Sequence, residues 1–368
     1  MRKAIIVGGG IAGLSAGIAL SKARWEVVVL ERAPRLEPIG AALSLWPNAC
    51  AALASLGVFP AVEAGASPIN SMLLGTRDGG RILDRPIPGP ALLSTRSHLQ
   101  HVLQASLPPG ALKLDCEVLR ARSGCVEIAD GETITGDLVV DAGGIGATSG
   151  ACEEPRYAGY GGVLALSGPI EGSGLEGQAA EFWGWGERFG VFELPKGQRY
   201  WFYMRSQPAH SRMPNIDECA WAARGWPEQV CKAIAATPAD ALIPFAVHAR
   251  KPPRSLFQNG ILKVGDAAHA MEPNLGQGAC QALEDAVALM HAASRNSAAE
   301  IGQAYEKARL DRVRMLVREA AQAGLGVHGP RAIQLLVRTA LKVVPRALSE
   351  LRISKMQILP EYRSRTEL

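Results

Sequence analysis

The sequence predicts an α/β protein with a parallel sheet, a second and mainly antiparallel sheet, and C-terminal helices. Three observations support this prediction. A glycine-rich turn joins an apolar strand to a helix at the start of the chain. Strand-like segments alternate over residues 155–250, and residues 182–203 alone contain nine of the chain's twenty aromatic side chains. Residues 300–368 then follow a mostly helical pattern that is rich in arginine.

The composition limits the class of protein. At 368 residues the chain is long enough for a large core or two domains. Its net charge of +4 is small, and no basic run with interleaved aromatic residues favours nucleic acid as a partner. Seven scattered cysteines without a CxxC pair indicate a reducing compartment, here the cytoplasm, and argue against disulfides or a metal site. No uninterrupted apolar run reaches the ~18–20 residues of a membrane span.

The first unit of the chain is predicted to be βαβ. Ala4–Val7 is a fully apolar strand, Ile11–Lys22 has a helical pattern, and Val27–Leu30 is a second strand. Residues 34–95 contain many prolines and glycines and little periodicity.

The next elements are predicted with less periodicity to support them. Ser97–Leu107 is expected to be helical, Cys116–Arg122 and Cys125–Ala129 form a hairpin, and Leu138–Val140 is a buried strand. Ile261–Val264 is again a strand of the parallel type, followed by a turn and a long helix from Gly278 to about Ser294.

The glycines of the first unit follow the pattern Gly8-x-Gly10-x-x-Gly13. In a dinucleotide-binding fold, the first glycine permits the tight turn, the second lets backbone approach a pyrophosphate, and the third lets the helix pack on the strand. The helix N-terminus offers free N–H groups and a partial positive charge to the phosphates. Glu31, 18 residues past Gly13, suits the hydroxyls of an adenosine ribose. A glycine turn without a ligand is the alternative.

A second motif, ILKVGDAAHAMEPNLGQG at residues 261–278, distinguishes NAD from FAD. Its strand delivers Asp266 at the carboxyl end, where α/β sheets bind ligands. The loop from Pro273 to Gly278 then leads into a helix whose N-terminal amides suit the negative charge of a reduced flavin ring. NAD needs no second motif some 250 residues downstream, whereas the long FAD molecule does. An ordinary strand–loop–helix is the alternative.

Four stretches carry a family resemblance: VGGGIAGLSAGIAL, ERAPRLEPIGAALSLWPNA, STRSHLQHVL and GDAAHAMEPNLGQGACQALEDA. With them the chain resembles the group A FAD-dependent monooxygenases, the family of the p-hydroxybenzoate and salicylate hydroxylases, and is most similar in pattern to the FAD-dependent urate hydroxylase type. The resemblance implies a p-hydroxybenzoate hydroxylase-type fold. Its Rossmann-like FAD-binding domain would comprise residues 1–70, 96–154 and 250–325, the substrate domain 71–95 and 155–249, and a helical segment 326–368.

The resemblance also implies the residues that contact FAD. Glu31 and Arg32 would border the adenosine, Val118 would hold the adenine by its backbone, and Arg96 would reach the phosphate–ribose region. Arg96 is a cation at the start of a helix, where the dipole does not favour it, and this supports an anionic ligand; a surface arginine is the alternative. The implied cofactor residues are Gly8, Gly10, Ile11, Ala12, Gly13, Glu31, Arg32, Ser44, Arg96, Val118, Asp266, Pro273, Asn274, Leu275, Gly276, Gln277 and Gly278.

In the sheet domain, the stretch GWGERFGVFELPKGQRYWFY resembles the substrate sheet of the urate hydroxylases. There an arginine and a tyrosine twelve residues apart help to define the substrate face, and Arg188 and Tyr200 match both types and the spacing. A guanidinium offers a planar fork to an anionic or heteroaromatic ligand, and a phenol offers one hydrogen bond and a ring face. The alternative is a hairpin in which an arginine stacks on aromatic residues.

Other polar residues are expected to be structural. His269 is interpreted as packing or capping near Asp266 rather than as a base, and no dedicated acid–base residue is identified. Glu284 and Asp285 follow the flavin loop and are expected to support the helix. The basic stretch ARLDRVRMLVREAA is expected to be a solvated helix face rather than a membrane or partner contact.

One turn departs from the family pattern. After the strand at Leu138–Val140, relatives have an aspartate where this chain has Gly143 and an arginine where it has Gly150. In relatives this turn serves both FAD and the nicotinamide. Each charge-assisted contact is worth ~1.5–3 kcal/mol where it is made. FAD binding is therefore expected to survive on the other motifs, while reduction by NAD(P)H is expected to be slow, rerouted or absent.

The predicted activity is an FAD-dependent monooxygenase that hydroxylates an aromatic or heteroaromatic small molecule. The resemblance implies that NADPH or NADH reduces FAD and that O2 then gives a flavin C4a-hydroperoxide, which transfers its distal oxygen. The chain would act as a monomer or homodimer. The alternatives are an FAD-dependent oxidase, epoxidase or other tailoring enzyme with altered NAD(P)H use, and a non-catalytic flavin-binding protein.

Overall fold

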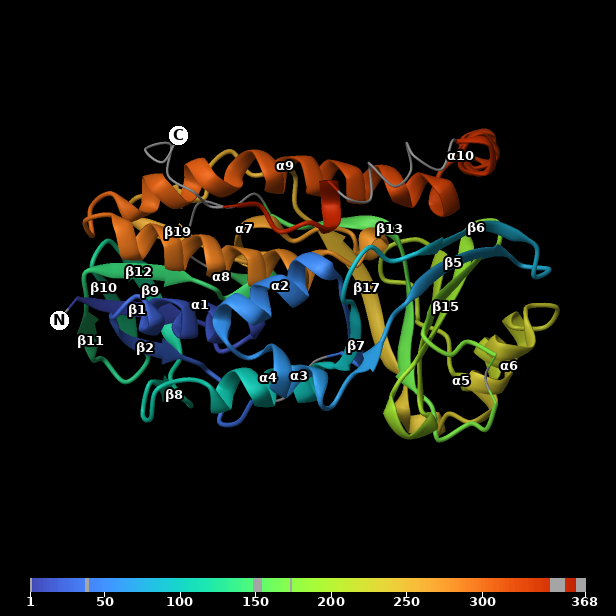
Figure 1. Ribbon diagram of the computed structural model, residues 1–368, viewed down its shortest axis with the longest axis horizontal. Coiled ribbons are helices and arrows are strands. Elements are labelled where there is room, and N and C mark those ends of the chain that lie inside the picture. Colours follow the sequence, from blue (N-terminus) through green and yellow to red (C-terminus); the bar gives the residue numbers. More distant parts are fainter. Residues whose placement is uncertain (1, 37–39, 148–153, 173, 345–354, 362–368) are drawn as a thin grey trace.

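The computed structural model describes residues 2–36, 40–147, 154–172, 174–344 and 355–361, and Figure 1 shows its two sheets at opposite ends of an elongated molecule. The first sheet has six strands in the order β18-β19-β12-β1-β2-β8, and all neighbours are parallel except β18 and β19. Its strands are β1 (Lys3–Val7), β2 (Glu26–Leu30), β8 (Leu112–Lys113), β12 (Leu138–Asp141), β18 (Phe257–Gln258) and β19 (Ile261–Lys263).

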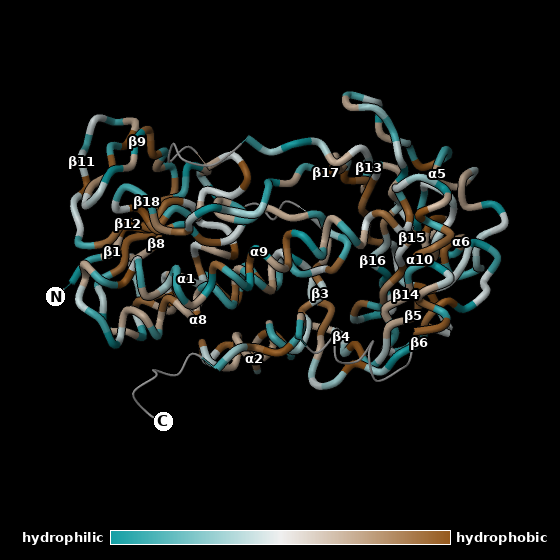
Figure 2. The backbone as a smooth tube through the Cα atoms, turned by 90° about the horizontal axis from the view of Figure 1, so that it is seen from above, coloured by the Kyte–Doolittle hydropathy of each residue, from teal (hydrophilic) through white to brown (hydrophobic). Residues whose placement is uncertain are grey.

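Helices cover one face of this sheet, and a small second sheet covers the other. The alternation of side chains along β1 directs Ala4 and Ile6 toward α1 (Ile11–Lys22), α8 (Gly278–Arg295) and α9 (Ile301–His328), while Ile5 faces the β9–β11 sheet. Figure 2 shows the apolar strands of the first sheet gathered at the end of the molecule next to the N-terminus. The strands of the small sheet are β9 (Val118–Arg122), β10 (Cys125–Ile128) and β11 (Thr133–Thr135).

The second large sheet has seven strands in the order β17-β13-β16-β15-β14-β5-β6. All its neighbours are antiparallel except β14 and β5, which are parallel, so the prediction of a mainly antiparallel sheet is confirmed. The strands are β5 (Ser71–Thr76), β6 (Arg81–Pro86), β13 (Arg156–Leu166), β14 (Gln178–Trp183), β15 (Glu187–Glu193), β16 (Arg199–Ser206) and β17 (Ile243–Ala249).

The two faces of this sheet have different partners. Phe189, Trp201 and Tyr203 form a core with the two short helices α5 (Ile216–Ala222) and α6 (Glu228–Ala235). On the other face, Phe192, Tyr200 and Phe202 join the core that continues into α1, α2 and α8. The strand-like pattern of residues 155–250 did not predict α5 and α6.

The remaining elements lie between the sheets or along the edge of the molecule. A three-stranded sheet has the order β3-β7-β4, with β3 (Ala42–Leu45), β4 (Ser67–Pro68) and β7 (Leu92–Thr95). The other helices are α2 (Pro47–Leu56), α3 (Phe59–Glu63), α4 (Arg96–Ala105), α7 (Asp266–His269) and α10 (Arg331–Val343), with 3-10 turns at Gly144–Gly146, Pro195–Gly197, Ala239–Ala241 and Pro273–Leu275. Among the described helices, none is long and apolar enough to cross a membrane.

Candidate active site

The first glycine turn packs tightly against the end of β12. Gly8 has φ +104°, and a Cβ atom there would lie 2.5 Å from the carbonyl oxygen of Ala142. A Cβ atom on Gly13 would lie 1.8 Å from the carbonyl oxygen of Gly8. Both glycines are therefore required by the protein itself, whether or not a ligand is bound.

Gly10 is different, because neither packing nor backbone conformation requires it. Its φ is −75°, and a Cβ atom there would meet nothing within 4 Å. Of the glycines that the structure describes, only Gly10, Gly146 and Gly278 combine open space with a φ outside the left-handed region. All three lie on loops predicted to meet FAD or the nicotinamide, and Gly10 and Gly278 stand at the starts of α1 and α8. Space kept open above three glycines fits a ligand that approaches the backbone closely.

The two ends of the predicted FAD site touch each other. Gly265, just before Asp266, has φ +58°, and a Cβ atom on it would lie 2.6 Å from the Cβ atom of Ala12. Gly276 in the second loop has φ +61°, and its Cβ would lie 2.8 Å from Nε1 of Trp46 and 3.8 Å from Cβ of Ser44. Residues 12, 44, 266 and 276, far apart in the sequence, are thus brought to one region.

Arg96 is the cation of this region. It is the first residue of α4, it is half-buried, and its guanidinium has no hydrogen bond or ion pair with any described residue. Burial lowers the pKa of Arg96, and the charge of Asp266 opposes this change. A half-buried guanidinium without a hydrogen bond or ion pair to a described residue fits a site for an anion such as a pyrophosphate.

The adenosine candidates lie at the end of β2. One carboxylate oxygen of Glu31 accepts from the backbone N–H of Gly9 at 2.6 Å, and the other accepts from Ala33 at 3.0 Å. Arg32 beside it is exposed. Val118 begins β9 and packs with the core that contains Leu30. Glu31 thus fixes the glycine turn by its own contacts, in addition to the ribose contact proposed for it.

The turn that departs from the family pattern has its own contacts. Oδ1 of the buried Asp141 accepts from the backbone N–H of Gly143 at 2.9 Å, and a Cβ on Gly143 would lie 3.1 Å from the same oxygen. Arg250, which lies after β17, donates to the carbonyl oxygen of Ile145. Position 150, where the family has an arginine, lies outside the described residues. A guanidinium therefore does reach this turn, but from a distant part of the chain.

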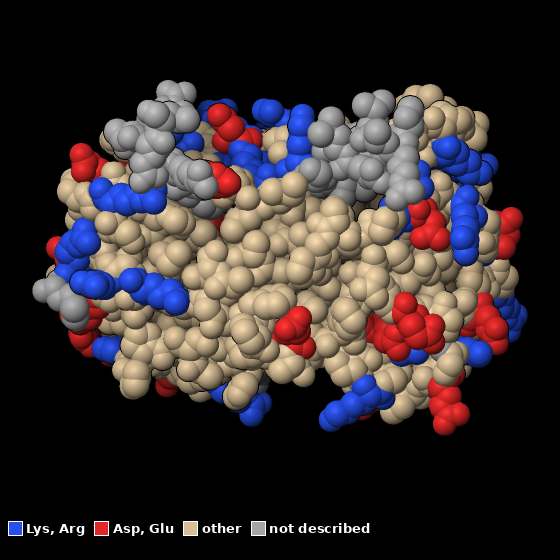
Figure 3. All heavy atoms as spheres, in the orientation of Figure 1, with Lys and Arg blue, Asp and Glu red and all other residues tan. Residues whose placement is uncertain are grey.

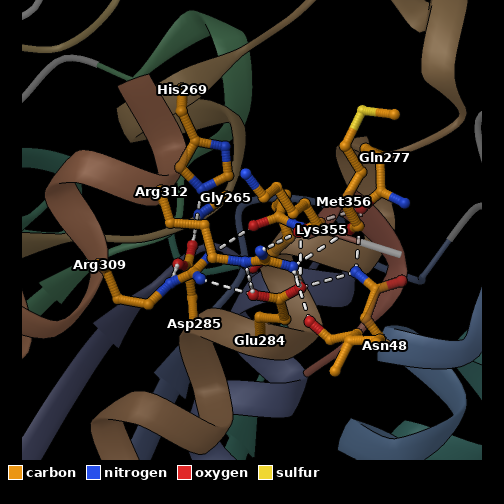
Figure 4. A network of polar contacts seen from close by, with 12 residues as sticks. Asn48, Gly265, His269, Gln277, Glu284, Asp285, Arg309, Arg312, Lys355 and Met356 are labelled. Atoms are coloured by element: carbon orange, nitrogen blue, oxygen red, sulfur yellow. Dashed lines mark hydrogen bonds and ion pairs between the residues drawn. The ribbon is translucent and has the colours of Figure 1, made fainter. Parts of the chain in front are cut away.

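A buried polar network adjoins the loop at residues 273–278, which is predicted to hold the flavin and is called the second FAD loop below; Figure 4 shows the network with Gln277 of this loop. Oδ2 of Asp285 accepts from the backbone N–H of Gly265 at 2.8 Å and is 2.7 Å from Nε2 of His269. The side chain of Arg309 contacts Asp285 at 2.8 Å and Glu284 at 2.6 Å, and all four side chains of this cluster are fully buried. His269 is buried and pairs with Asp285, whereas the sequence analysis had expected it to pack or cap near Asp266.

The same network extends to Gln277 and to the C-terminal segment. Glu284 accepts from Arg312 and from Asn48, and Asn48 also donates to Oε1 of Gln277 at 2.9 Å. Arg312 donates to the carbonyl oxygens of Lys355 and Met356. Burial raises the pKa values of Glu284 and Asp285, but neighbouring cations more than offset it, so both pKa values lie below their ordinary range. The network therefore holds the 265 and 277 loops with fixed charges.

The predicted substrate residues lie on the face of the second sheet that looks toward the first domain. Arg188 is 4% exposed, and its guanidinium donates to Glu181 at 3.0 Å and to Oδ1 of Asn274 at 2.6 Å. It also lies over the ring of Phe202, 5.5 Å from the centroid. The arginine is therefore both stacked on an aromatic ring and joined to the second FAD loop.

Asn274 uses every hydrogen-bonding position of its side chain on the protein. Its Oδ1 accepts from Arg188 and from the Tyr160 hydroxyl at 3.1 Å, while its Nδ2 donates to Glu272 and to the carbonyl oxygen of Ala320, both at 2.9 Å. Because these partners come from β15, β13, α9 and the loop itself, Asn274 connects the second sheet to the FAD loop. Its side chain has no position left for the cofactor.

Unlike Asn274, Tyr200 has a polar group that makes no hydrogen bond to the described protein. It is half-buried beside Phe192 and Phe202, whose ring centroids lie 5.6 and 6.2 Å away. Its hydroxyl has no hydrogen bond with any described residue. Burial raises the pKa of this phenol, so it is neutral at physiological pH. It is available as a hydrogen-bond donor on a face that is apolar apart from Arg188 and its partners.

Sequence reasoning missed several residues of this site. Asn48, Glu181, Tyr160 and Glu272 lie outside the motifs or carry no recognisable spacing, and only the folded chain brings them to Gln277, Arg188 and Asn274. Burial raises the pKa of Glu272 and lowers that of His328, which stacks on Tyr160 at 3.9 Å, to about 3. The MEPN stretch was a signal for Glu272, since the acid immediately precedes the loop.

Known proteins resemble this chain over most of its length. Residues 178–320 match the family model of an FAD binding domain, and residues 6–38 match that of an NAD(P)-binding Rossmann-like domain. Aurachin C monooxygenase/isomerase of Stigmatella aurantiaca is 34% identical over 339 residues, which cover 87% of this chain and 88% of that protein. An FAD-dependent urate hydroxylase of Klebsiella oxytoca is 32% identical over 354 residues, with 89% and 91% covered.

Solved structures agree with these matches. Klebsiella pneumoniae HpxO complexed with FAD and uric acid superposes with a TM-score of 0.88 at 26% identity, covering 96% of both chains. A salicylate hydroxylase substrate complex shares the fold, with a TM-score of 0.79 at 20% identity over 98% of both chains. The predicted α/β fold, the FAD cofactor and the enzyme class are thereby confirmed. The chain belongs to the FAD-dependent monooxygenases of the p-hydroxybenzoate and salicylate hydroxylase family.

Proposed function

We propose that this protein hydroxylates an aromatic or heteroaromatic small molecule, with NADPH or NADH as the reductant and O2 as the co-substrate. Bound FAD supplies the activation of O2 and the transfer of one oxygen atom. The observation that carries the proposal is the 2.6 Å bond from Arg188 to Asn274. It joins the candidate substrate face to the loop that is expected to hold the flavin ring.

The residues of the substrate face have separate proposed roles. Tyr200 would donate its free hydroxyl to a polar substituent of the ring, and Arg188 would supply the positive charge that favours an anionic or hydroxylated substrate. Phe192 and Phe202 would pack against the ring and exclude water. The face is otherwise apolar, which supports a ring with few polar substituents.

The FAD contacts are proposed residue by residue. Gly10 and the N-terminus of α1 would meet the pyrophosphate, Glu31 the ribose of the adenosine, Arg96 the phosphate–ribose region, and Val118 the adenine. Asp266 would bind the ribityl chain. The backbone of the loop from Pro273 through Leu275, Gly276 and Gln277 to Gly278 would face the flavin ring, with Ser44, Ile11 and Ala12 beside it.

A second candidate function is an FAD-dependent oxidase or epoxidase that does not use NAD(P)H in the family manner. Gly143 favours it, because the turn lacks the carboxylate that relatives have there. Two features favour the monooxygenase instead: the open space above Gly146, and the hydrogen bond from Arg250 to the carbonyl oxygen of Ile145. With them, a phosphate-bearing ligand can still approach the backbone of the turn and a positive charge.

Anaerobic stopped-flow spectroscopy of the FAD-loaded protein separates the two functions. We expect NADPH or NADH to bleach the flavin, and a panel of aromatic acids and purines to contain a ligand that accelerates bleaching. Tyr200→Phe should raise KM for that ligand about two- to tenfold, equivalent to one neutral hydrogen bond, with flavin content unchanged. Bleaching by neither nucleotide with any ligand would contradict the monooxygenase and leave the oxidase.

A further inference from the structure

Helix α10 (Arg331–Val343) is apolar on two sides. One side packs on the protein, where Val337 and Leu341 join the cluster of Leu74, Ile82, Trp183 and Val327. The other side is exposed: Leu335, Leu336 and Val343 are 60%, 65% and 72% exposed, and Ile333 is 37% exposed. Single exposed apolar side chains scattered over a protein surface are ordinary. Several of them on one helix form a patch, and such a patch indicates an interaction surface.

The position of these side chains on the helix is regular. At 3.6 residues per turn, Ala332, Leu336, Thr339 and Val343 lie in one row along the middle of the exposed side. Leu335 lies on one side of this row and Ile333 on the other. Figure 1 shows α10 end-on at the edge of the molecule, beyond the end of α9.

Cations border the same surface. Arg331 and Lys342, both exposed, are eleven residues apart and therefore lie along the same edge of the apolar row, about three turns from each other. Arg338 is next to them, donates to the carbonyl oxygen of Gly184, and lies 4.3 Å from the ring centroid of Trp185, which is 51% exposed. Between residues 320 and 349 the sequence has four cations and no acid.

We infer that the exposed face of α10, with Trp185 at its edge, docks on an anionic lipid surface. An amphipathic helix with leucines on one side and cations beside them lies in the membrane interface, and a tryptophan ring favours the same level. Each cation near an anionic surface contributes about 1 kcal/mol. The charge of Asp78 interacts with that of Lys342, so Arg331 is the cation expected to contribute more.

A second copy of the chain is a weaker occupant for this face. Four partly exposed side chains cannot supply the ~800 Å² per partner of a stable interface. Pairing α10 with α10 would also bring cations against cations, since no acid lies on this helix to neutralise them. An anionic surface satisfies both the apolar row and its charged edge.

Vesicle flotation of the FAD-loaded protein tests the inference. We expect binding to vesicles containing 30% phosphatidylglycerol, at least tenfold weaker binding to pure phosphatidylcholine, and a loss of binding as salt rises from 50 to 500 mM. Leu336→Glu should lower binding to the anionic vesicles at least tenfold, and Arg331→Gln about two- to fivefold. Both residues are exposed, so both variants should keep the wild-type unfolding temperature and flavin content.

The matched control is Leu119→Glu, because Leu119 is 58% exposed on β9 near the opposite end of the molecule. It should bind the anionic vesicles like the wild type. Equal binding by Leu336→Glu and the wild type, or no preference of the wild type for anionic vesicles, would overturn the inference. So would a wild-type dimer that Leu336→Glu converts to a monomer, as measured by sedimentation velocity.

Discussion

At the residue scale, glycines separate what the fold requires from what a ligand requires. Gly8 and Gly13 are in contact with backbone atoms that a Cβ would overlap, so any protein with this turn needs them. Gly10 has open space above it and an ordinary φ. In the sequence motif, glycines required by packing and glycines required by a ligand look the same, and only the structure distinguishes them. Gly10 is therefore the sharper probe of the cofactor.

Gly10→Ala should weaken FAD binding while the protein still folds. The new Cβ meets no protein atom but occupies the space through which a pyrophosphate approaches, so we expect the Kd for FAD to rise at least about tenfold, or 1.4 kcal/mol. The unfolding free energy of the apoprotein should fall by about 1 kcal/mol or less, as for alanine at a helix N-cap. Flavin fluorescence titration measures the first and urea denaturation the second.

Gly302→Ala is the contrasting variant. Its Cβ would lie 2.3 Å from the ring of Phe257, so the apoprotein should be destabilised while the folded fraction binds FAD normally. If Gly10→Ala instead bound FAD as the wild type does, the proposed approach of the pyrophosphate to Gly10 would be wrong.

At the element scale, two buried carboxylates of helix α8, Glu284 and Asp285, hold the second FAD loop in place. Glu284 and Asp285 accept from Arg309 and Arg312 of α9, and through Gly265 and Asn48 they hold both sides of the loop region. Figure 3 shows a different picture at the surface, where the described charged side chains of one face are scattered around a broad uncharged centre. The charges that shape the site are thus the buried ones.

Arg309→Met should destabilise the protein by about 3–5 kcal/mol, because it leaves two buried carboxylates without their shared partner. The pKa values of Glu284 and Asp285 are lowered in the folded protein, so the stability they contribute is present above the unfolded pKa values near 4 and is lost as the pH falls further. Urea midpoints should therefore differ most between wild type and variant at neutral pH, with a smaller gap near pH 3.

Arg318→Met on the same helix is the control, since Arg318 is exposed and its loss should change stability by about 0.5 kcal/mol or less. Equal stabilities of Arg309→Met and Arg318→Met at neutral pH would show that the buried network does not support α8.

The sequence predicted the elements with a strong period and missed those whose pattern was mixed. Helix α1 was predicted with its observed bounds, and the long helix α8 to within one residue. Helix α2 lies in a segment with many prolines and glycines and begins with Pro47, so its pattern was overlooked. Helices α5 and α6 were hidden in a region dominated by aromatic strands. The division into domains stays a prediction.

For the site, the motifs predicted residues that would contact FAD through the backbone, because glycine spacing is visible in a sequence. They could not locate residues that act by meeting across the fold. Arg188 and Asn274 are 86 residues apart, and Asn48 and Glu284 are 236 apart. The distant Arg250 likewise reaches the turn that the sequence showed only as lacking charge.

At the scale of the whole molecule, the second sheet turns one face to its own helices and the other to the FAD-binding region. Arg188 and Asn274 connect the two parts at the place where Tyr200 has a free hydroxyl. The central claim is that FAD and the aromatic substrate meet at this junction. Family membership supports FAD as the cofactor, whereas the proposed position of FAD and substrate at this junction rests on the geometry described above.

A crystal structure of the complex with FAD and an aromatic ligand tests that claim most directly. We expect the pyrophosphate against Gly10, the flavin ring against the backbone of residues 275–278, and the ligand ring between the flavin and the face of Arg188, Tyr200 and Phe202. A ligand bound elsewhere, with the Tyr200 hydroxyl still without a partner, would contradict it.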